Sequence, residues 1–307
     1  MRAIGFSGYF SRKQQMELIE ENCKHPKRVL YYQDSRDPDG VQAQYDLEVG
    51  RGIGLSVFGT VDDQSNFYPD FWYPYMTPET VSSSDAIVTV DKRVDNNSYS
   101  GQCDDLRLGV TVIYRLLNAL EYRKSIDADP NALQHVNQKL LGLSLNGHIL
   151  MPIHKTQDEI ERGERLFNER QDLVHLAEAG DENAGQKLSA LEIETTDNAM
   201  NRMQQYDEDY YSVVESVMMP HGVECELYSI LGEIKKISYT ANNVTLDQIC
   251  RMTVEINHFQ FEVGINVTDL VGEPAVGRRF KGNVWMLGTL EFPEKPDSNS
   301  DGADAEN

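Results

Sequence analysis

The chain has 307 residues and a formal net charge of −22. A chain this acidic repels nucleic acid and anionic membranes at long range, and no stretch reaches the roughly 18 consecutive apolar residues that a membrane helix needs. The four cysteines are scattered without a CxxC pair, which argues against a zinc ribbon or a disulfide framework and predicts reduced thiols in a cytoplasmic protein.

The first 154 residues predict an α+β domain built on an antiparallel sheet with helices. Ser11 and Gln14 form a capping-box pattern that starts the first helix. Alternating apolar and polar residues are typical of half-buried strands, and the last predicted strand continues into a helix near Leu116. Strands are predicted over residues 27–34, 41–49, 53–57, 86–94 and 106–114.

Three further features of this domain are read from turn and cap residues. Asp129 and Pro130 favour a helix start, so a helix is predicted over residues 129–140. Asn146-Gly147 is the strongest short hairpin signal in the chain. The run NFYPDFWYPYM at 66–76 contains two prolines and predicts a rigid loop packed on the sheet.

An acidic helical connector is predicted over residues 155–210. Residues 151–221 contain 6 Lys and Arg against 16 Asp and Glu. Thr156 and Glu159 form a second capping box, and Gly180 ends the helix that follows. Further helices are predicted over residues 182–194 and 198–206. Such a segment serves as a spacer or as a docking surface for a basic partner.

Residues 211–293 predict a small β-barrel of OB-like shape or a strongly coiled antiparallel sheet, because four or five strands alternate with short turns. The alternation slips by one residue at Lys235-Lys236, which indicates a β-bulge. The tail 294–307 has one Lys against five acidic residues and no apolar period, so it is predicted to be disordered.

The stretch GEPAVGRRFKGNVW at 272–285 resembles a phosphate-binding loop, but two departures argue against one. Arg278 stands where such a loop has lysine, and Arg279 stands where it has Ser or Thr to hold magnesium. A phosphate loop also opens a helix, whereas a strand pattern follows here. Gly272, Pro274 and Gly277 therefore predict a turn between two strands.

Strand alternation places Arg279, Lys281 and Trp285 on one outer face, with Arg278 beside them. Cations next to an aromatic ring can hold single-stranded nucleic acid. Residues 222–292 nevertheless hold 6 Lys and Arg against 9 Asp and Glu, so the basic footprint of a nucleic-acid domain is missing. Glu255 and Glu262 on neighbouring strands also offer partners for these cations. The pattern favours a structural or partner-contacting hairpin.

No catalytic, cofactor-binding or metal-ligating residue is predicted. The histidines form no HExxH or HxH pattern, GxSxG does not occur, and 50 acidic residues do not single out a catalytic pair. Phe71 and Trp72 in the aromatic run can anchor a partner protein or pack on the sheet, and packing is the favoured interpretation.

Three passages of the chain carry a resemblance to a known family. They are MRAIGFS at 1–7, VESVMMPHGVECELYSILGEI at 214–234 and INVTDLVGEPAVGRRFKGNVWMLG at 265–288. Over almost its whole length the chain resembles an uncharacterised family from Clostridia and related Gram-positive anaerobes, a domain of unknown function. The resemblance implies a bacterial cytosolic protein and carries over no catalytic residues. Where the family often has Trp-Leu-Gln-Gly, this chain has Trp285-Met286-Leu287-Gly288, which puts a polar role at position 287 in doubt.

These features favour a non-enzymatic binding or regulatory protein whose partner is another protein. Two alternatives stay open. One is a β-barrel that binds nucleic acid or another anionic ligand along Arg279, Lys281 and Trp285. The other is an enzyme with an unrecognised site in the N-terminal domain, near residues 66–76. The sequence predicts no cofactor and leaves the oligomeric state open.

Overall fold

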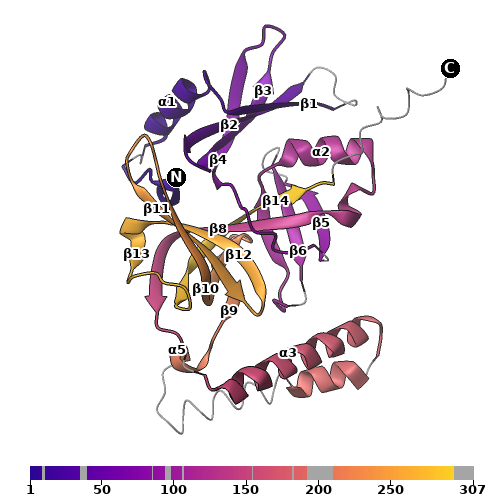
Figure 1. Ribbon diagram of the computed structural model, residues 1–307. Helices are drawn as coiled ribbons and strands as arrows, with labels where there is room; N and C mark the ends of the chain where they lie inside the picture. The colour runs from indigo at the N-terminus through magenta and orange to yellow at the C-terminus, as the bar shows by residue number, and fades with distance from the viewer. Residues whose placement is uncertain are drawn as a thin grey trace, which may run out of the picture.

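The protein is an α+β structure, which confirms the predicted class, and its parts lie in three levels (Figure 1). A four-stranded sheet lies at the top of the view, a ten-stranded sheet in the middle and a helical hairpin at the bottom. The computed structural model describes residues 1–8, 11–34, 40–84, 86–93, 98–105, 107–153, 155–181, 183–191 and 210–293.

The four-stranded sheet is an antiparallel meander in the order β1-β2-β3-β4. The predicted hairpin of the second and third strands is confirmed, since Leu47 pairs with Leu55 across it. The alternation of apolar and polar residues predicts this hairpin well because one face of each strand packs into the core. The bounds are β1 (Arg28–Gln33), β2 (Val41–Gly50), β3 (Ile53–Val61) and β4 (Phe67–Met76).

The aromatic run at 66–76 is a strand, so the prediction of a loop is wrong. It forms β4, whose outer side is an edge of the sheet. Pro69 and Pro74 are tolerated there because an edge strand has one row of N–H groups that needs no partner in the sheet. The prolines therefore mark an edge rather than a break in the strand.

The ten-stranded sheet follows the order β13-β8-β12-β11-β10-β14-β7-β6-β5, and β9 pairs with β10. β8 pairs antiparallel with β14 and parallel with β12. Because β8 has both neighbours, five strands pair in a closed circuit: β8, β12, β11, β10 and β14. The bounds are β5 (Ile87–Lys92), β6 (Tyr99–Asp104), β7 (Val112–Leu116), β8 (Asn137–Leu150), β9 (Val217–Pro220), β10 (Leu227–Ala241), β11 (Gln248–Ile256), β12 (Phe259–Asn266), β13 (Leu270–Val271) and β14 (Arg279–Glu291).

The helices begin where the capping patterns predict them. Ser11 with Gln14 and Thr156 with Glu159 both form complete capping boxes. Residues 183–191 are also helical. None of the described helices has the length and apolar content needed to cross a membrane. The bounds are η1 (Arg2–Ile4), α1 (Arg12–Asn22), α2 (Ala119–Ala128), η2 (Ala132–His135), α3 (Gln157–Glu178), α5 (Tyr210–Val213) and η3 (Val267–Asp269).

Strand β8 overturns two predictions. The helix predicted over 129–140 is only the short η2, and the hairpin predicted at Asn146-Gly147 lies inside a continuous strand of 14 residues. Long-range pairing with β14 outweighs the local signals here. Gly147 is needed for space, since a Cβ atom at this position would lie 2.5 Å from the Phe280 ring.

Other local differences are smaller. Residues 99–104 form β6, a strand that the sequence did not predict, between the two predicted strands of that region. The predicted bulge at Lys235-Lys236 is confirmed by a register shift between β10 and β11. The third predicted connector helix, at 198–206, and the tail 294–307 lie outside the described residues.

One hydrophobic core joins both sheets. It includes Leu55 of the small sheet and Leu140 and Phe261 of the large one, each essentially unexposed. β8 precedes the predicted domain boundary at residue 154, yet it completes the strand circuit of residues 211–293. The division into domains at 154 stays a prediction, and this shared sheet does not favour it.

The four cysteines are unpaired, and we expect one of them to react first with thiol reagents. Cys225 is exposed, whereas Cys103 and Cys250 are buried. Burial raises the pKa of Cys103 to about 12 and that of Cys250 to about 11, which suppresses the reactive thiolate. At pH 8, iodoacetamide should modify Cys225 at least ~10-fold faster than either buried thiol. Peptide mass spectrometry over time measures the rates, and equal rates would contradict the buried positions.

Candidate functional site

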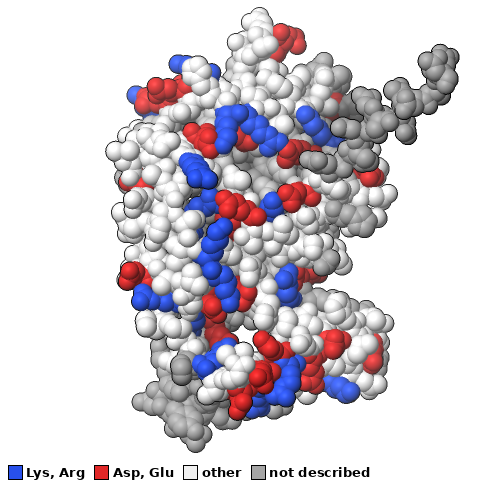
Figure 2. All heavy atoms as spheres, in the orientation of Figure 1, with Lys and Arg blue, Asp and Glu red and all other residues white. Residues whose placement is uncertain are grey.

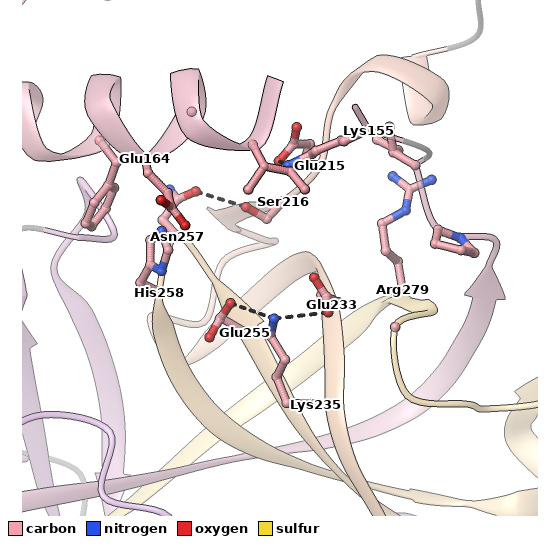
Figure 3. A pocket seen from close by; sticks show the side chains of 16 residues that line it. Lys155, Glu164, Glu215, Ser216, Glu233, Lys235, Glu255, Asn257, His258 and Arg279 are labelled. Carbon is pink, nitrogen blue, oxygen red and sulfur yellow. Dashed lines mark hydrogen bonds and ion pairs between the residues drawn. The ribbon is translucent and has the colours of Figure 1, made fainter. Parts of the chain in front are cut away.

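A cleft of about 620 Å³ lies between α3 and the ends of the large sheet (Figure 3). Figure 2 shows a notch between the helical hairpin and the body of the molecule. The α3 residues that face the sheet recur at helical spacing and are half-buried. They are Phe167, Arg170, Gln171 and Val174. A second hollow, of about 540 Å³, is lined by Gln171 and His175, so α3 packs loosely on the sheet.

The helix is held to the sheet by a ring contact at the tip of the β11–β12 hairpin. The Phe167 and His258 rings lie 4.4 Å apart between centroids. Asn257 and His258 form a two-residue turn with positive φ angles of 49° and 64°, the type I′ geometry that Asn-Gly prefers. A histidine at the second position costs conformational energy. The contact with Phe167 is a role for the His258 ring that a glycine at this position could not fill.

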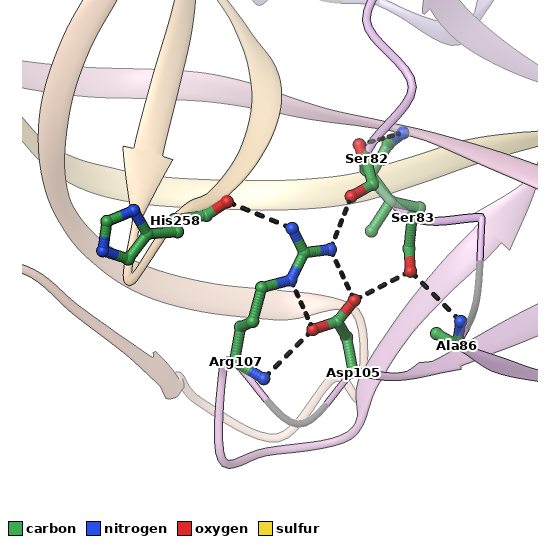
Figure 4. A network of polar contacts seen from close by, with 7 residues as sticks. Ser82, Ser83, Ala86, Asp105, Arg107 and His258 are labelled. Atoms are coloured by element: carbon green, nitrogen blue, oxygen red, sulfur yellow. Dashed lines mark hydrogen bonds and ion pairs between the residues drawn. The ribbon is translucent and has the colours of Figure 1, made fainter. Parts of the chain in front are cut away.

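A partly buried network fixes the backbone of this tip (Figure 4). Arg107 donates through Nη1 to the carbonyl of His258 at 3.1 Å and through Nη2 to that of Ser82 at 3.0 Å. It also forks onto Asp105, with Nε–Oδ1 at 2.8 Å and Nη2–Oδ2 at 2.6 Å. Burial raises the pKa of Asp105, but hydrogen bonds from Arg107 and Ser83 outweigh burial and lower it overall. The network positions the turn.

Ser83 in this network is not an activated nucleophile. Its Oγ donates to Asp105 Oδ2 at 2.7 Å and accepts from the N–H of Ala86 at 3.2 Å. A nucleophilic serine needs a base that can take its proton, whereas this hydroxyl donates to a carboxylate already held by Arg107. We therefore assign Ser83 a structural role.

Most of the charges that line the cleft are paired within the chain. Lys235 Nζ lies 3.0 Å from Glu233 Oε1 and 3.0 Å from Glu255 Oε1, and Lys155 pairs with Glu215 (Figure 3). Burial raises the pKa of Glu255, but hydrogen bonds from Gln260 and Lys235 outweigh it and lower the pKa overall. Among the described residues, Glu164 of α3 has no ion-pair partner, so it leaves one carboxylate of this wall available.

The structure places Arg279 on this cleft but directs its guanidinium into the protein. Arg279 is 7% exposed and donates to three carbonyls: Met151 at 3.0 Å, Val214 at 2.9 Å and Tyr211 at 2.7 Å. Sequence reasoning missed this role because carbonyl acceptors leave no trace in the side-chain pattern. Arg279 anchors the chain around α5 to the sheet.

The other predicted contact residues are dispersed. Lys281 lies 3.9 Å from the centroid of the Tyr211 ring, and Arg278 donates to the carbonyl of Glu273 at 2.6 Å. Trp285 meets Tyr73 edge-on at 5.9 Å. Gly272 and Gly277 have φ angles of 93° and 84°, and β14 follows them, as expected for a turn between strands.

Glu255 and Glu262, which the sequence offers as partners for Arg279 and Lys281, form ion pairs with other residues. Glu255 pairs with Lys235, and Glu262 pairs with Arg251 at 2.9 Å. Alternation could not show which cation lies next to which acid across the register shift at Lys235.

Phe71 and Trp72 lie in β4 and pack against the core. Phe71 stacks on Phe58 at 5.0 Å and contacts Tyr73 at 5.3 Å, and Trp72 is half-buried. The residues that join α3 to the sheet, Phe167 and His258, were not singled out from the sequence. A usable signal was present, since Asn257-His258 separates two alternating runs by two residues.

Replacing His258 by glycine should separate the turn from the helix contact. Asn-Gly suits a type I′ turn, so the free energy of unfolding should change by less than about 1 kcal/mol. α3 loses its ring contact, and its amides at 157–178 should exchange faster with deuterium. Phe167→Ala should have the same effect on α3, and the double variant should add little. Unchanged exchange in both single variants would show that this contact does not hold the helix.

The described residues contain no group of three or more His, Cys, Asp or Glu side chains that could hold a metal ion. Fold and site together define an α+β protein with a helical hairpin set over a cleft at the end of a mixed sheet. Residues 1–288 match the family described as "Domain of unknown function, E. rectale Gene description (DUF3881)", and the chain belongs to this family. This confirms the expected uncharacterised family. A comparison with curated proteins and one with solved structures each found no match.

Proposed function

We propose that this chain is a non-catalytic binding protein that holds a protein partner on the hairpin of α3 and residues 183–191. The partner segment carries Lys or Arg next to apolar side chains, and its apolar groups enter the cleft under α3. The four free cysteines are compatible with a cytoplasmic location, where thiols stay reduced.

The exposure of the α3 side chains supports the proposal most directly. None of its described side chains is buried over 22 residues. Ile160, Leu166 and Leu176 are 39%, 37% and 50% exposed, and Ile160 lines the cleft. Exposed apolar side chains on an amphipathic helix, with charged side chains around them, are typical of an interaction surface. A partner that covers them would remove this apolar surface from water.

Charge indicates the chemistry of the partner. α3 contains seven Asp and Glu against three Arg, and Figure 2 shows acidic side chains gathered over the helical hairpin, with Lys and Arg between them. Complementary charge speeds encounter and selects partners. A basic segment is therefore favoured over an acidic one, with Glu164 at the cleft as one contact for its cations.

The alternatives receive less support from the geometry. An anionic ligand along Arg279 and Lys281 would have to displace the carbonyls and the Tyr211 ring that these cations already contact. An enzyme needs a nucleophile, a base or a metal in the cleft, and the lining carboxylates Glu233, Glu255 and Glu215 are paired with lysines.

Photo-crosslinking in the native cell tests the proposal. A benzophenone amino acid replaces Ile160 in one strain and Val244 in another, since Val244 is 45% exposed in the β10–β11 turn, at the end of β11 opposite to Asn257 and the cleft. We expect ultraviolet light to give a protein adduct at position 160, whose partner has a basic segment, and no such adduct at position 244. Mass spectrometry of the adduct identifies the cross-linked peptide.

Two outcomes would overturn the proposal. One is the same set of adducts at positions 160 and 244, which would mean that α3 has no special contact. The other is an adduct at 160 whose cross-linked segment is acidic, or a nucleic acid in place of a protein. The last result would support the anionic-ligand alternative.

A further inference from the structure

A groove of about 950 Å³ separates the two sheets on the side of α2, at a distance in sequence and in space from the cleft under α3. One wall is the inner face of β1 to β4, and the other is formed by α2, the start of β8 and the end of β14. A volume of this size is within the range of small-molecule sites. Its chemistry is set by three residues: Asp46, Gln44 and Tyr75.

Asp46 brings an uncompensated carboxylate to the groove. Its Oδ1 accepts from Gln44 Nε2 at 2.9 Å and from Ser56 Oγ at 2.6 Å. No Lys or Arg among the described residues forms an ion pair with it, and Oδ2 is left without a hydrogen bond there. A carboxylate in a partly closed site favours a cation beside it.

The cations of the rim are engaged elsewhere. Lys27 pairs with Glu48 and Arg28 pairs with Glu121. Lys139 pairs with Glu291. Lys124 of α2 also lines the rim, where it is exposed to solvent and its charge is screened. The rim thus has four cations against three acids. Lys124 and Asp46 are the two charges of the groove without an ion pair among the described residues, and Lys124 is exposed whereas Asp46 is half-buried.

Gln44 lies beside Asp46, and its side-chain oxygen has no hydrogen-bond partner among the described residues. Gln44 is 2% exposed and lines the groove. The amide orientation is fixed, because both Nε2 hydrogens are used, by Asp46 Oδ1 and by the carbonyl of Leu117 at 3.1 Å. The Oε1 atom is itself closed off from solvent, so the contribution of Gln44 is to hold the Asp46 carboxylate in place through Nε2.

Tyr75 and apolar side chains complete the lining. Burial raises the pKa of Tyr75, and the carboxylates of Asp46 and Glu48 raise it further, so its hydroxyl stays protonated at neutral pH. Its ring offers a face for a cation. Leu30, Leu290 and Phe292 provide apolar surface beside it. The site thus combines a carboxylate, an aromatic ring and an apolar wall.

We infer that this groove binds a small organic cation, an alkylammonium compound whose charged head pairs with Asp46 Oδ2 next to the Tyr75 ring. The alkyl part lies along Leu30, Leu290 and Phe292. This site is independent of the protein contact proposed for α3, so either proposal can fail without the other.

Calorimetric titration of the full chain with n-hexylammonium and with n-hexanoate tests the inference, since the two probes share the chain and differ in charge. We expect hexylammonium to bind and hexanoate not to bind. Asp46→Asn keeps an acceptor for Gln44 and Ser56 and removes the charge, so it should weaken hexylammonium binding at least ~10-fold. Asp63→Asn removes an exposed charge in the β3–β4 turn and should leave binding unchanged.

A second measurement places the ligand without any variant. In the wild-type chain, hexylammonium should shift the methyl resonance of Met76, a buried residue on the groove, and hexanoate should not. Equal binding of both probes, an unshifted Met76 methyl group at saturating hexylammonium, or full binding by a folded Asp46→Asn variant would each overturn the inference.

Discussion

Glu226→Ala is expected to lower the free energy of unfolding by about 3–5 kcal/mol. Glu226 is 2% exposed, and its Oε1 lies 2.7 Å from Arg93 Nη1 and 3.1 Å from Arg115 Nη2. Arg115 is itself buried on β7 and lies over the Tyr73 ring at 5.2 Å. Truncating Glu226 leaves a buried guanidinium without its counter-charge, which is the costly half of a broken ion pair.

Urea denaturation followed by circular dichroism measures this effect. Glu224→Ala is a matched control, because Glu224 is exposed two residues away, and its effect should stay within about 0.5 kcal/mol. If both variants lose the same small amount of stability, Glu226 does not hold β7 against the loop before β10.

Arg279→Ala is expected to lower the free energy of unfolding by about 2–3 kcal/mol and to release the chain around α5. Three backbone carbonyls would lose their donor, two of them, Tyr211 and Val214, in or next to α5. Arg279→Lys should recover only part of the loss, since an ammonium group cannot reproduce the planar fork.

Denaturation and deuterium exchange of residues 210–216 measure this prediction together. Arg278→Ala serves as the control, because the Arg278 side chain bonds Glu273 within its own loop. Its effect should be below about 1 kcal/mol. Unchanged exchange at 210–216 in Arg279→Ala would mean that Arg279 is not the anchor of this segment.

The strands that the sequence predicted best are those with local evidence. β2, β3, β11 and β12 have one buried face and neighbours close in sequence, so alternation and turn residues agree. The prediction failed for β8 because its neighbours β14 and β12 come more than 100 residues later in the sequence. Its glycine at 147 is fixed by the Phe280 ring, a contact that only the folded chain brings together.

The same difference between local and long-range evidence applies to the candidate site. Alternation placed Arg279 on an outer face, whereas its side chain is 7% exposed and directed into the protein. The basic partner expected from the composition of the connector stays a proposal. The partners of Arg279 are backbone carbonyls, which every residue carries, so no side-chain pattern could reveal them. The contact of Phe167 with His258 joins a helix and a turn that are 91 positions apart, and the spacing within either element gives no sign of it.

The central claim is that α3 and its cleft bind a basic, apolar protein segment, and Ile160→Glu tests it most directly. Fluorescence anisotropy measures the binding of a short labelled peptide of Lys and Leu to the wild-type chain, to Ile160→Glu and to Val244→Glu, whose position lies in the β10–β11 turn away from α3. Both variants add one negative charge, so a purely electrostatic attraction would strengthen binding in both. We expect binding to the wild-type chain, at least ~10-fold weaker binding to Ile160→Glu, and no loss in Val244→Glu. Equal or tighter binding to Ile160→Glu would contradict it.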